Sequence, residues 1–428
     1  MKYHIIIFGC QMNHADAERI ETVMKSMSYG KTDTMEDADA IIVVACSVRQ
    51  HAIDRIYGLK KSFDKVRKVR PVRVILTGCV VEGDKKNMSE FFDDIIPITK
   101  IQDLPKMLGG LAPVDVKEYL SIAPKHTSEY QAFIPISRGC NLFCSYCVVP
   151  YTRGREVCRD YNEIIDECKH LIARGYKKIT LLGQTVNSYK YKDVDFTELL
   201  RRIDSIPGDF WIYFLSSHPN FFTKELIEVW KKSKHIAPFL HLAAQSGDDD
   251  MLKKMNRKYG VKKFTGVVDM VRKAIPDITV STDFIVGYPN ETKKQFDNTS
   301  KLMRALHFDM AYISKYSQRK GTLGEKLHKD DIVLEEKKNR HKILNDILKK
   351  TALEKNKKYI GNIVQALVEG EKGEYWFGKT NTFKNIKIKH KKLQDDFIGK
   401  FVDVKIIRAN AWGIFGEMVL ARKKTAMQ

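Results

Sequence analysis

Cys140, Cys144 and Cys147 lie within one short loop, with three residues and then two residues between them. This spacing allows three thiolates to hold three corners of a cubane iron–sulfur cluster. A cluster held by protein alone needs four thiolates, so one iron stays open for a small ligand. The alternative is zinc, but a structural zinc ion takes four ligands, commonly from two Cys-x-x-Cys pairs. The chain has no second such pair, which favours the cluster.

A second group of three cysteines follows predicted strands. Cys10, Cys46 and Cys79 each lie within two residues of the end of a near-continuous β-branched run, which is typical of a buried parallel strand. Helical patterns lie between the runs, so we expect a doubly wound parallel sheet. Its carboxyl-end edge would bring the thiols together as a second metal site. The alternative is three buried structural cysteines. The strands are predicted at residues 3–8, 40–45 and 72–77, and the helices at 16–27 and 49–63.

Composition indicates a large, basic protein with a basic C-terminal segment. The 428 residues suggest several domains, and no apolar run is long enough to span a membrane. Eight cysteines without a secretion signal favour a reducing, cytoplasmic compartment. The net charge is +21, and residues 356–428 hold 15 Lys and Arg against 7 Asp and Glu. The density of positive charge in this segment favours a nucleic-acid-binding module over a uniformly lysine-rich composition.

The pattern of runs predicts three domains, at residues 1–125, 126–355 and 356–428. Strand–helix alternation in the second domain predicts a (β/α)6 partial barrel, followed by one long charged helix at 331–358. The third domain has short alternating strands separated by glycine-containing turns, which predicts a small five-stranded β-barrel. The barrel strands are expected at 133–136, 178–182, 210–215, 239–243, 279–286 and 309–316, and the tail strands at 364–369, 385–389, 401–407 and 414–419.

Several aromatic and basic side chains of the tail are candidates for RNA contacts. Tyr375, Trp376, Phe377 and Trp412 are able to stack on bases, with Lys379 beside them. The alternative is that these rings form the core of the small barrel.

The chain resembles the radical S-adenosylmethionine methylthiotransferases, in particular the 2-methylthio-N6-isopentenyladenosine synthases that modify tRNA. The resemblance covers all three segments, and the tail is similar to the RNA-binding TRAM barrel. It rests on the motifs FGCQMN (8–13), ACSVR (45–49), GCV (78–80), CVVPYTRGRE (147–156), LLGQTVNSY (181–189), IGK (398–400), WG (412–413) and GE (416–417).

This resemblance implies two [4Fe–4S] clusters and S-adenosylmethionine as cofactors. The cluster on Cys140, Cys144 and Cys147 would cleave S-adenosylmethionine, and the cluster on the other triad would carry the sulfur that is methylated. The product would be a methylthio group on C2 of N6-isopentenyladenosine beside the anticodon. Such a C–H bond has no acidity for a side chain to exploit, so the cofactor must carry the hard step.

Other residues match the radical family by position. Those expected to bind the cofactor are Tyr146, Gln184, Gln245, Arg257 and Asp283. Arg153 and Arg155 would contact RNA phosphate or a cluster, with a solvated surface as the alternative. Cys158 and Cys168 match no ligand position and are expected to be structural.

The resemblance also implies partners: tRNA, an electron donor such as flavodoxin or ferredoxin, and a sulfur source. A monomer is expected. Departures from the family pattern occur in the loop that contains Gln318 and Lys320, at Ala243 and Ala244, and at Asn290. The alternatives are modification of threonylcarbamoyladenosine or of a ribosomal-protein aspartate, and a non-catalytic iron–sulfur protein that binds RNA.

Overall fold

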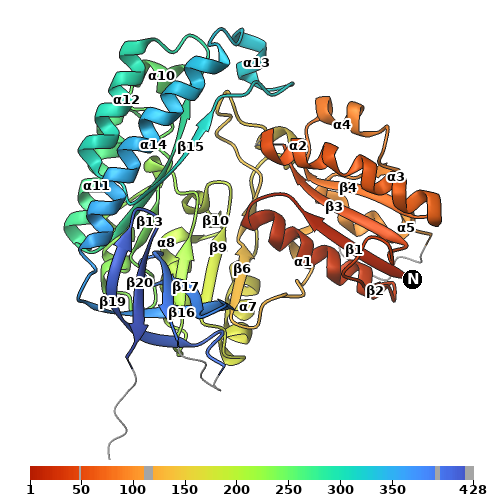
Figure 1. The fold of residues 1–428 in the computed structure, drawn as a ribbon, viewed down its shortest axis with the longest axis horizontal. Coiled ribbons are helices and arrows are strands. Elements are labelled where there is room, and N and C mark those ends of the chain that lie inside the picture. Colours follow the sequence, from red (N-terminus) through yellow and green to blue (C-terminus); the bar gives the residue numbers. More distant parts are fainter. Residues whose placement is uncertain (48–49, 110–118, 391–395, 420–428) are drawn as a thin grey trace, which may run out of the picture.

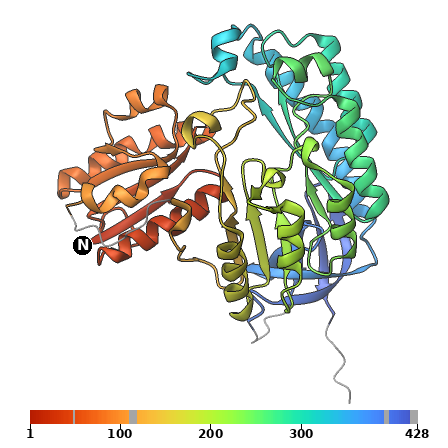
Figure 2. The same ribbon diagram turned by 180° about the vertical axis from the view of Figure 1, so that it is seen from behind.

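The computed structural model describes residues 1–47, 50–109, 119–390 and 396–419. Figure 1 shows an N-terminal α/β unit in red and orange, a central unit in yellow to light blue, and a small dark-blue barrel beneath the central unit. Seen from behind, the N-terminal unit again stands beside the central one (Figure 2). In these described ranges no helix is long and apolar enough to cross a membrane.

The N-terminal sheet has five parallel strands in the order β2-β1-β3-β4-β5, which confirms the predicted doubly wound sheet. Every residue of β3 is buried, because apolar clusters pack on both faces of the sheet. The strand order reverses between β1 and β3, where open α/β sheets bind ligands. The strands are β1 (Lys2–Ile7), β2 (Gly30–Lys31), β3 (Ala40–Cys46), β4 (Arg73–Cys79) and β5 (Asp94–Ile95).

Two helices of this unit differ from the prediction. Helix α1 (Gln11–Ser26) begins directly after Cys10, five residues earlier than expected. The helix expected over 49–63 is two helices, and Gly58, the poorest helix former in the segment, ends the first; Arg49 lies outside the described residues. The other helices are α2 (Gln50–Gly58), α3 (Lys60–Val69), α4 (Glu82–Met88) and α5 (Leu104–Met107), with 3-10 turns at Ile98–Asp103 and Tyr119–Ser121.

The central unit is the predicted (β/α)6 partial barrel. Its six parallel strands run in chain order as two three-stranded sheets. Isolated bridges next to β12 and β13, which pair Ile212 with Ile236 and Ser217 with Leu242, connect these sheets. Within the described residues β6 and β15 do not pair, so the barrel stays open. The strands are β6 (Gln131–Pro135), β9 (Lys178–Leu182), β12 (Trp211–Phe214), β13 (Phe239–His241), β14 (Thr279–Val286) and β15 (Met310–Lys315).

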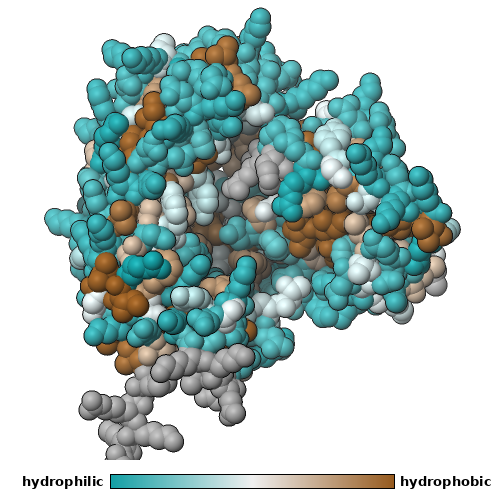
Figure 3. Space-filling view, viewed as in Figure 1, coloured by the Kyte–Doolittle hydropathy of each residue, from teal (hydrophilic) through white to brown (hydrophobic). Residues whose placement is uncertain are grey.

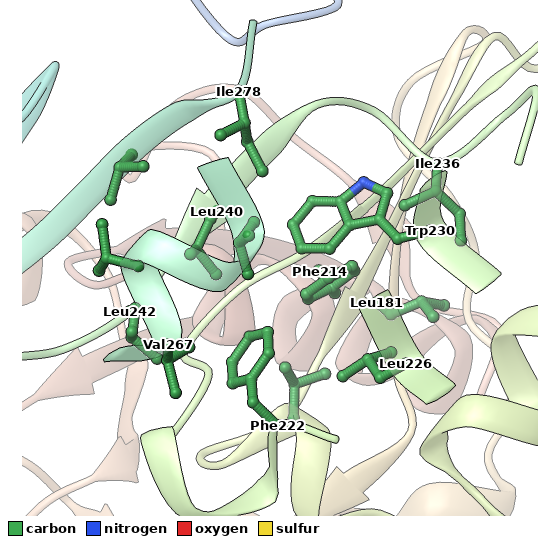
Figure 4. Packing of buried hydrophobic residues seen from close by; sticks show 14 of the residues in the cluster. Leu181, Phe214, Phe222, Leu226, Trp230, Ile236, Leu240, Leu242, Val267 and Ile278 are labelled. Carbon is green, nitrogen blue, oxygen red and sulfur yellow. The ribbon is translucent and has the colours of Figure 1, made fainter. Parts of the chain in front are cut away.

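Helices cover the outside of the central sheet and form the largest apolar core. Phe214, Trp230 and Leu240 meet in this core, as Figure 4 shows. The helices are α7 (Tyr161–Ala173), α8 (Phe196–Asp204), α9 (Lys224–Lys232), α10 (Asp249–Lys254), α11 (Val261–Ala274), α12 (Lys293–Leu306), α13 (Leu323–Leu327) and α14 (Leu334–Lys357). The short elements are β7 (Ser137–Arg138), α6 (Val149–Thr152), β8 (Val157–Cys158), β10 (Lys190–Tyr191), β11 (Val194–Asp195) and 3-10 turns at Val186–Ser188 and Pro219–Phe221.

The C-terminal unit is the predicted small barrel, closed in the order β16-β17-β18-β20-β19. Leu367 and Phe401 pack against Trp211 of the central sheet, so the two units share an apolar interface. The predicted domain boundaries stay predictions. The strands are β16 (Ile363–Lys372), β17 (Tyr375–Thr380), β18 (Asn385–Lys389), β19 (Phe401–Asn410) and β20 (Gly413–Met418).

Candidate active site

The cysteines at the ends of β3 and β4 are neighbours. Cys46 and Cys79 are register partners and both are buried. The strands approach closely because Gly78 precedes Cys79. A Cβ on Gly78 would lie 2.2 Å from the carbonyl oxygen of Ala45, and its φ of +108° is one that side chains rarely allow. Glycine at this position therefore lets the two thiols stand side by side.

Cys10 joins them through Asn13. The side-chain oxygen of Asn13 accepts a hydrogen bond from the Cys10 amide at 3.2 Å, and its nitrogen donates to the carbonyl of Ala45 at 3.1 Å. Asn13 is fully buried, so it ties the start of α1 to the end of β3. Cys10 precedes the first turn of α1, where the helix dipole favours negative charge.

The loop with the other triad, residues 140–147, is closed at its base by the antiparallel ribbon of β7 and β8. Gly139 has a φ of +76°, and a Cβ there would lie 2.1 Å from the carbonyl oxygen of Arg155. The amide of Cys140 donates to the carbonyl of Gly154 at 3.2 Å. The segment after α6 therefore braces this radical-site loop.

Burial favours the protonated form of three of these thiols in the metal-free chain. It raises the pKa of Cys147 to about 12, and it also raises the pKa of Cys140 and of Cys79. A metal binds the thiolate, so binding must release these protons. Arg257 stabilises negative charge at the remaining sulfur of the loop, since its Nη1 donates to Cys144 Sγ at 3.0 Å.

All six cysteines line one cavity of about 280 Å³. The two predicted metal sites therefore open onto one shared space, which the sequence alone did not reveal. No three His, Cys, Asp or Glu side chains in the described part of the chain are arranged to hold a single metal ion. The lining cysteines are Cys10, Cys46, Cys79, Cys140, Cys144 and Cys147.

The residues expected to bind the cofactor line the same cavity. Gln245 is buried and has a φ of +67°. Its backbone N–H donates a hydrogen bond to the backbone carbonyl of Asp283 at 2.8 Å. Non-glycine residues with such φ values cluster at functional sites. The side-chain oxygen of Gln184 is buried and has no hydrogen-bond partner among the described residues, which suits a donor from a ligand. The expected residues are Tyr146, Gln184, Gln245, Arg257 and Asp283.

Arg257 supplies the fixed positive charge of this cavity. Burial opposes its charge, but the neighbouring Tyr146, Tyr259 and Cys144 raise its pKa well above the usual range. His218, which sequence reasoning missed, also lines the cavity; burial and then Arg257 lower its pKa to about 3, so its imidazole is neutral. Its only sequence signal is its place just after the end of β12.

These side chains fit the cofactors that the sequence implies. Each triad offers three thiols and leaves a fourth cluster position open. Arg257 suits a carboxylate, Asp283 suits ribose hydroxyls, and the free acceptor of Gln184 suits an ammonium or hydroxyl group.

A second cavity, of about 610 Å³, adjoins the first and shares Cys10 and Asp283 with it. All three units contribute to its wall, with α1 on one side and Phe383 of the small barrel on another. Figure 3 shows this face of the molecule hollowed between the N-terminal unit and the central one. Its apolar side chains are Phe133, Leu215, Phe239 and Phe383.

Arg153 is not an RNA-binding residue. Its side chain is 1% exposed, so phosphate has no access to it. Its Nε donates to Cys79 Sγ at 2.8 Å and its two Nη atoms donate to Asp16, with Nη1 at 3.2 Å. The alternative expectation, that Arg153 contacts a cluster site, therefore fits the structure, because its side chain binds the thiol of Cys79. Arg155 instead lies over the ring of Phe143, at 4.3 Å.

Trp376 is also unavailable for stacking on RNA. It is 2% exposed, and its ring stacks on His390 inside the small barrel. The barrel-core alternative is correct for this residue. Tyr375, Phe377 and Trp412 are exposed, and Lys379 donates to Asn385 Oδ1 at 2.6 Å. Cys158 and Cys168 line neither cavity; Cys158 lies in β8, and Cys168 is buried on the inner face of α7.

Family models match three ranges of the chain. They are the uncharacterized protein family UPF0004 at residues 2–97, the radical SAM superfamily at 134–303 and the TRAM domain at 357–419. A solved radical S-adenosylmethionine methyltransferase, TsrM from Kitasatospora setae, has a similar fold, with a TM-score of 0.57 and 13% identity over 76% of this chain and 77% of that one. Fold and site together define an enzyme of the radical S-adenosylmethionine class.

Two relatives place the chain more narrowly. A tRNA-2-methylthio-N(6)-dimethylallyladenosine synthase of Finegoldia magna is 36% identical over 97% of this chain and 94% of its own length. A protein of the same name from Clostridium botulinum is 38% identical over 98% of this chain and 97% of its own length. The chain belongs to the radical S-adenosylmethionine methylthiotransferase family, in the branch of these synthases.

Proposed function

We propose that this enzyme adds a methylthio group to C2 of N6-dimethylallyladenosine beside the anticodon of tRNA, using two S-adenosylmethionine molecules and two [4Fe–4S] clusters. The observation that carries the proposal is the single cavity lined by both cysteine triads. A group on one triad and a cofactor on the other can then act on one substrate atom without leaving the site.

The residues of the chain hold and orient the reactants. When bound, the cluster at Cys140, Cys144 and Cys147 supplies the electron that cleaves S-adenosylmethionine, and the N-terminal cluster supplies the methylthio sulfur. Arg257 keeps its charge and binds the carboxylate of the cofactor. His241 Nε2 lies 3.1 Å from Asp283 Oδ2. This contact orients the carboxylate of Asp283 toward the ribose hydroxyls of the cofactor.

The second cavity supports the choice of substrate. Its apolar side chains suit a dimethylallyl group, and its volume of about 610 Å³ accommodates a flipped nucleoside. Its described lining has no Lys or Arg but includes Glu18 and Asp283. The carboxylate of a threonylcarbamoyl group, or of a protein aspartate, would find no Lys or Arg partner in this lining. This lining disfavours both alternative substrates, and the ligand set around Arg257 disfavours a non-catalytic protein.

The outer face of the small barrel supports a tRNA partner. Strand registers place Phe377, Lys387, Phe415 and Arg408 in one row across four strands. The Arg408 guanidinium lies 4.2 Å from the centre of the Phe415 ring. Cations interleaved with aromatic rings suit phosphates and unpaired bases. Lys379 and Tyr375 continue this face along β17.

The chemistry requires an electron donor of the flavodoxin or ferredoxin type and a sulfur source. We propose that the enzyme acts in the cytoplasm, where tRNA and reduced thiols coexist.

The test is mass spectrometry of tRNA nucleosides from a strain with and without the gene, followed by assay of the reconstituted protein. Anticodon stem-loops that carry dimethylallyl-, threonylcarbamoyl- or unmodified adenosine should be compared. We expect methylthio product from the dimethylallyl substrate above the others, and iron and sulfide for two clusters per chain. A preference for the threonylcarbamoyl substrate, or a single cluster, would contradict the proposal.

A further inference from the structure

Arg153 lies at the junction of the two cysteine triads. Its backbone belongs to the segment that braces the radical-site loop: its carbonyl accepts from Arg138 Nη1 at 3.2 Å, and its amide donates to Val149 at 2.8 Å. Its side chain leaves this unit and reaches Cys79 and Asp16 in the N-terminal one. One residue thus touches Cys79 of one triad and belongs to the segment that braces the loop of the other.

The charge of Arg153 is fixed by its surroundings. Its guanidinium stays protonated in a protein, and the buried carboxylate of Asp16 pairs with it. Asp16 is fully buried and is oriented by a further hydrogen bond from the hydroxyl of Tyr119. A buried pair of this kind keeps its geometry only when every partner is in place.

If Arg153 served only to form an ion pair between the two units, a contact with Asp16 would be sufficient. Arg153 uses both Nη atoms for that carboxylate and keeps its Nε–H for the sulfur of Cys79. The other triad has a matching contact, from Arg257 Nη1 to Cys144 Sγ. Each triad therefore has at least one sulfur that receives a charged N–H donor, and such bonds tune the potential of a cluster.

We propose that Arg153 is a positioning residue that fixes the N-terminal triad against the radical-site loop and raises the reduction potential of the group bound at Cys10, Cys46 and Cys79. The inference rests on the two-cluster function proposed above. A positive N–H donor on a sulfur ligand stabilises the reduced, more negative state, and its removal has the opposite effect.

The test uses the full chain with Cys140, Cys144 and Cys147 replaced by alanine, so that any bound cluster occupies the N-terminal triad. Iron and sulfide analysis first establishes that cluster. Redox titration followed by electron paramagnetic resonance then gives its midpoint potential. We expect Arg153→Met to shift the potential to a more negative value and Arg155→Met, two residues away on the ring of Phe143, to leave it unchanged.

Two further variants separate tuning from structural support. In the metal-free full chain, the effects of Asp16→Asn and Arg153→Met on the unfolding temperature should not add in the double variant, because the two side chains bind each other. If Arg153→Met does not fold, Arg153→Lys replaces it, because lysine keeps the charge but lacks the planar fork that bonds both oxygens of Asp16 and the sulfur of Cys79. An unchanged potential in a folded Arg153 variant, or an equal shift in Arg155→Met, would overturn the inference. Absence of iron from the starting chain would overturn the two-cluster function, and this inference with it.

Discussion

Phe383, in the loop between β17 and β18, stacks on Phe239 of β13, with ring centroids 4.3 Å apart and planes 21° apart. Phe383 has a φ of +63°, which a bulky residue holds only where its contacts fix it. The amine of Lys379 lies 4.4 Å from the centre of its ring. The C-terminal barrel is therefore part of the wall of the larger cavity, besides offering a surface to RNA.

Phe383→Ala should weaken both the structure and substrate selection. The partly buried ring leaves a gap against Phe239, so we expect the free energy of unfolding to fall by about 2 kcal/mol. KM for the dimethylallyl stem-loop should rise more than KM for the unmodified one. Phe377→Ala is the control for selectivity, since that ring is 42% exposed on the outer face of the same barrel and lines neither cavity; its loss should raise both KM values alike. Equal losses of stability and selectivity in both variants would contradict this role for Phe383.

The sequence predicted most strands because burial leaves a clear signature in them. The β-branched run of β3 and the cysteine that ends it were both readable, as were β9 and β14 at their observed bounds. The strand β17 was not predicted, because Trp376 within it was interpreted as an RNA contact. Its alternation of exposed Tyr375 and Phe377 with buried Trp376 is the pattern of a half-buried strand.

The sequence indicated which residues belong to the candidate site, but not how they are arranged in space. Residue spacing and predicted strand ends indicated the two triads, and the resemblance to the radical family supplied the candidate cofactor residues. It could not show that Arg153 is buried, because burial depends on how the N-terminal unit packs beside β6. Asn13 and Asp16 were missed for the same reason: their partners, Ala45 and Arg153, are distant in the chain. Contacts between units are set by packing, which no local pattern records.

Stability should depend on pH through His126, which joins α1 to α7. Its Nδ1 lies 3.1 Å from Glu18 and its Nε2 lies 3.3 Å from Glu167. Burial opposes protonation, but hydrogen bonds to Glu167 and Glu18 raise the pKa of His126 to about 9. A folded pKa above the unfolded value gives stability that is complete below about pH 6.5 and is lost as the pH rises through about 9.

Chemical unfolding at pH 6, 7.5 and 9.5 measures this contribution. We expect wild-type stability to fall by up to about 3 kcal/mol across this range, given the size of the pKa change. His126→Asn should remove most of that slope. His307→Asn is the control, because the side chain of His307 is 56% exposed. A slope that survives in His126→Asn would show that other groups cause it.

RNA binding should depend on the row of cations and rings on the small barrel. Lys387 is exposed between Phe377 and Phe415, so Lys387→Gln should remove one phosphate contact. The slope of log affinity against log salt should decrease in magnitude by about 1 for tRNA. Lys349→Gln, on an exposed position of α14, should leave the slope unchanged. Identical slopes in the two variants would show that Lys387 does not belong to the RNA-binding surface.

Gly78→Ala should disable the N-terminal triad selectively. A Cβ at 2.2 Å from the Ala45 carbonyl must push β3 and β4 apart, which separates Cys46 from Cys79. We expect a loss of stability of about 1–3 kcal/mol from this overpacking. The reconstituted variant should hold iron and sulfide for one cluster, because the radical-site loop lies in another unit with its own three thiols.

The same variant should still form 5′-deoxyadenosine under a strong reductant but should yield no methylthio nucleoside, because the sulfur-carrying site is gone. Gly58→Ala is the matched control in the same unit, since a Cβ at Gly58 meets nothing within 4 Å. Both products should be measured in parallel. Cys144→Ala should instead lose the radical-site cluster, keep the N-terminal cluster and form no 5′-deoxyadenosine. Methylthio product from Gly78→Ala with only the radical-site cluster present would show that the N-terminal triad does not carry the sulfur. Loss of S-adenosylmethionine cleavage in Gly78→Ala, with that cluster intact, would show instead that the two triads do not act separately.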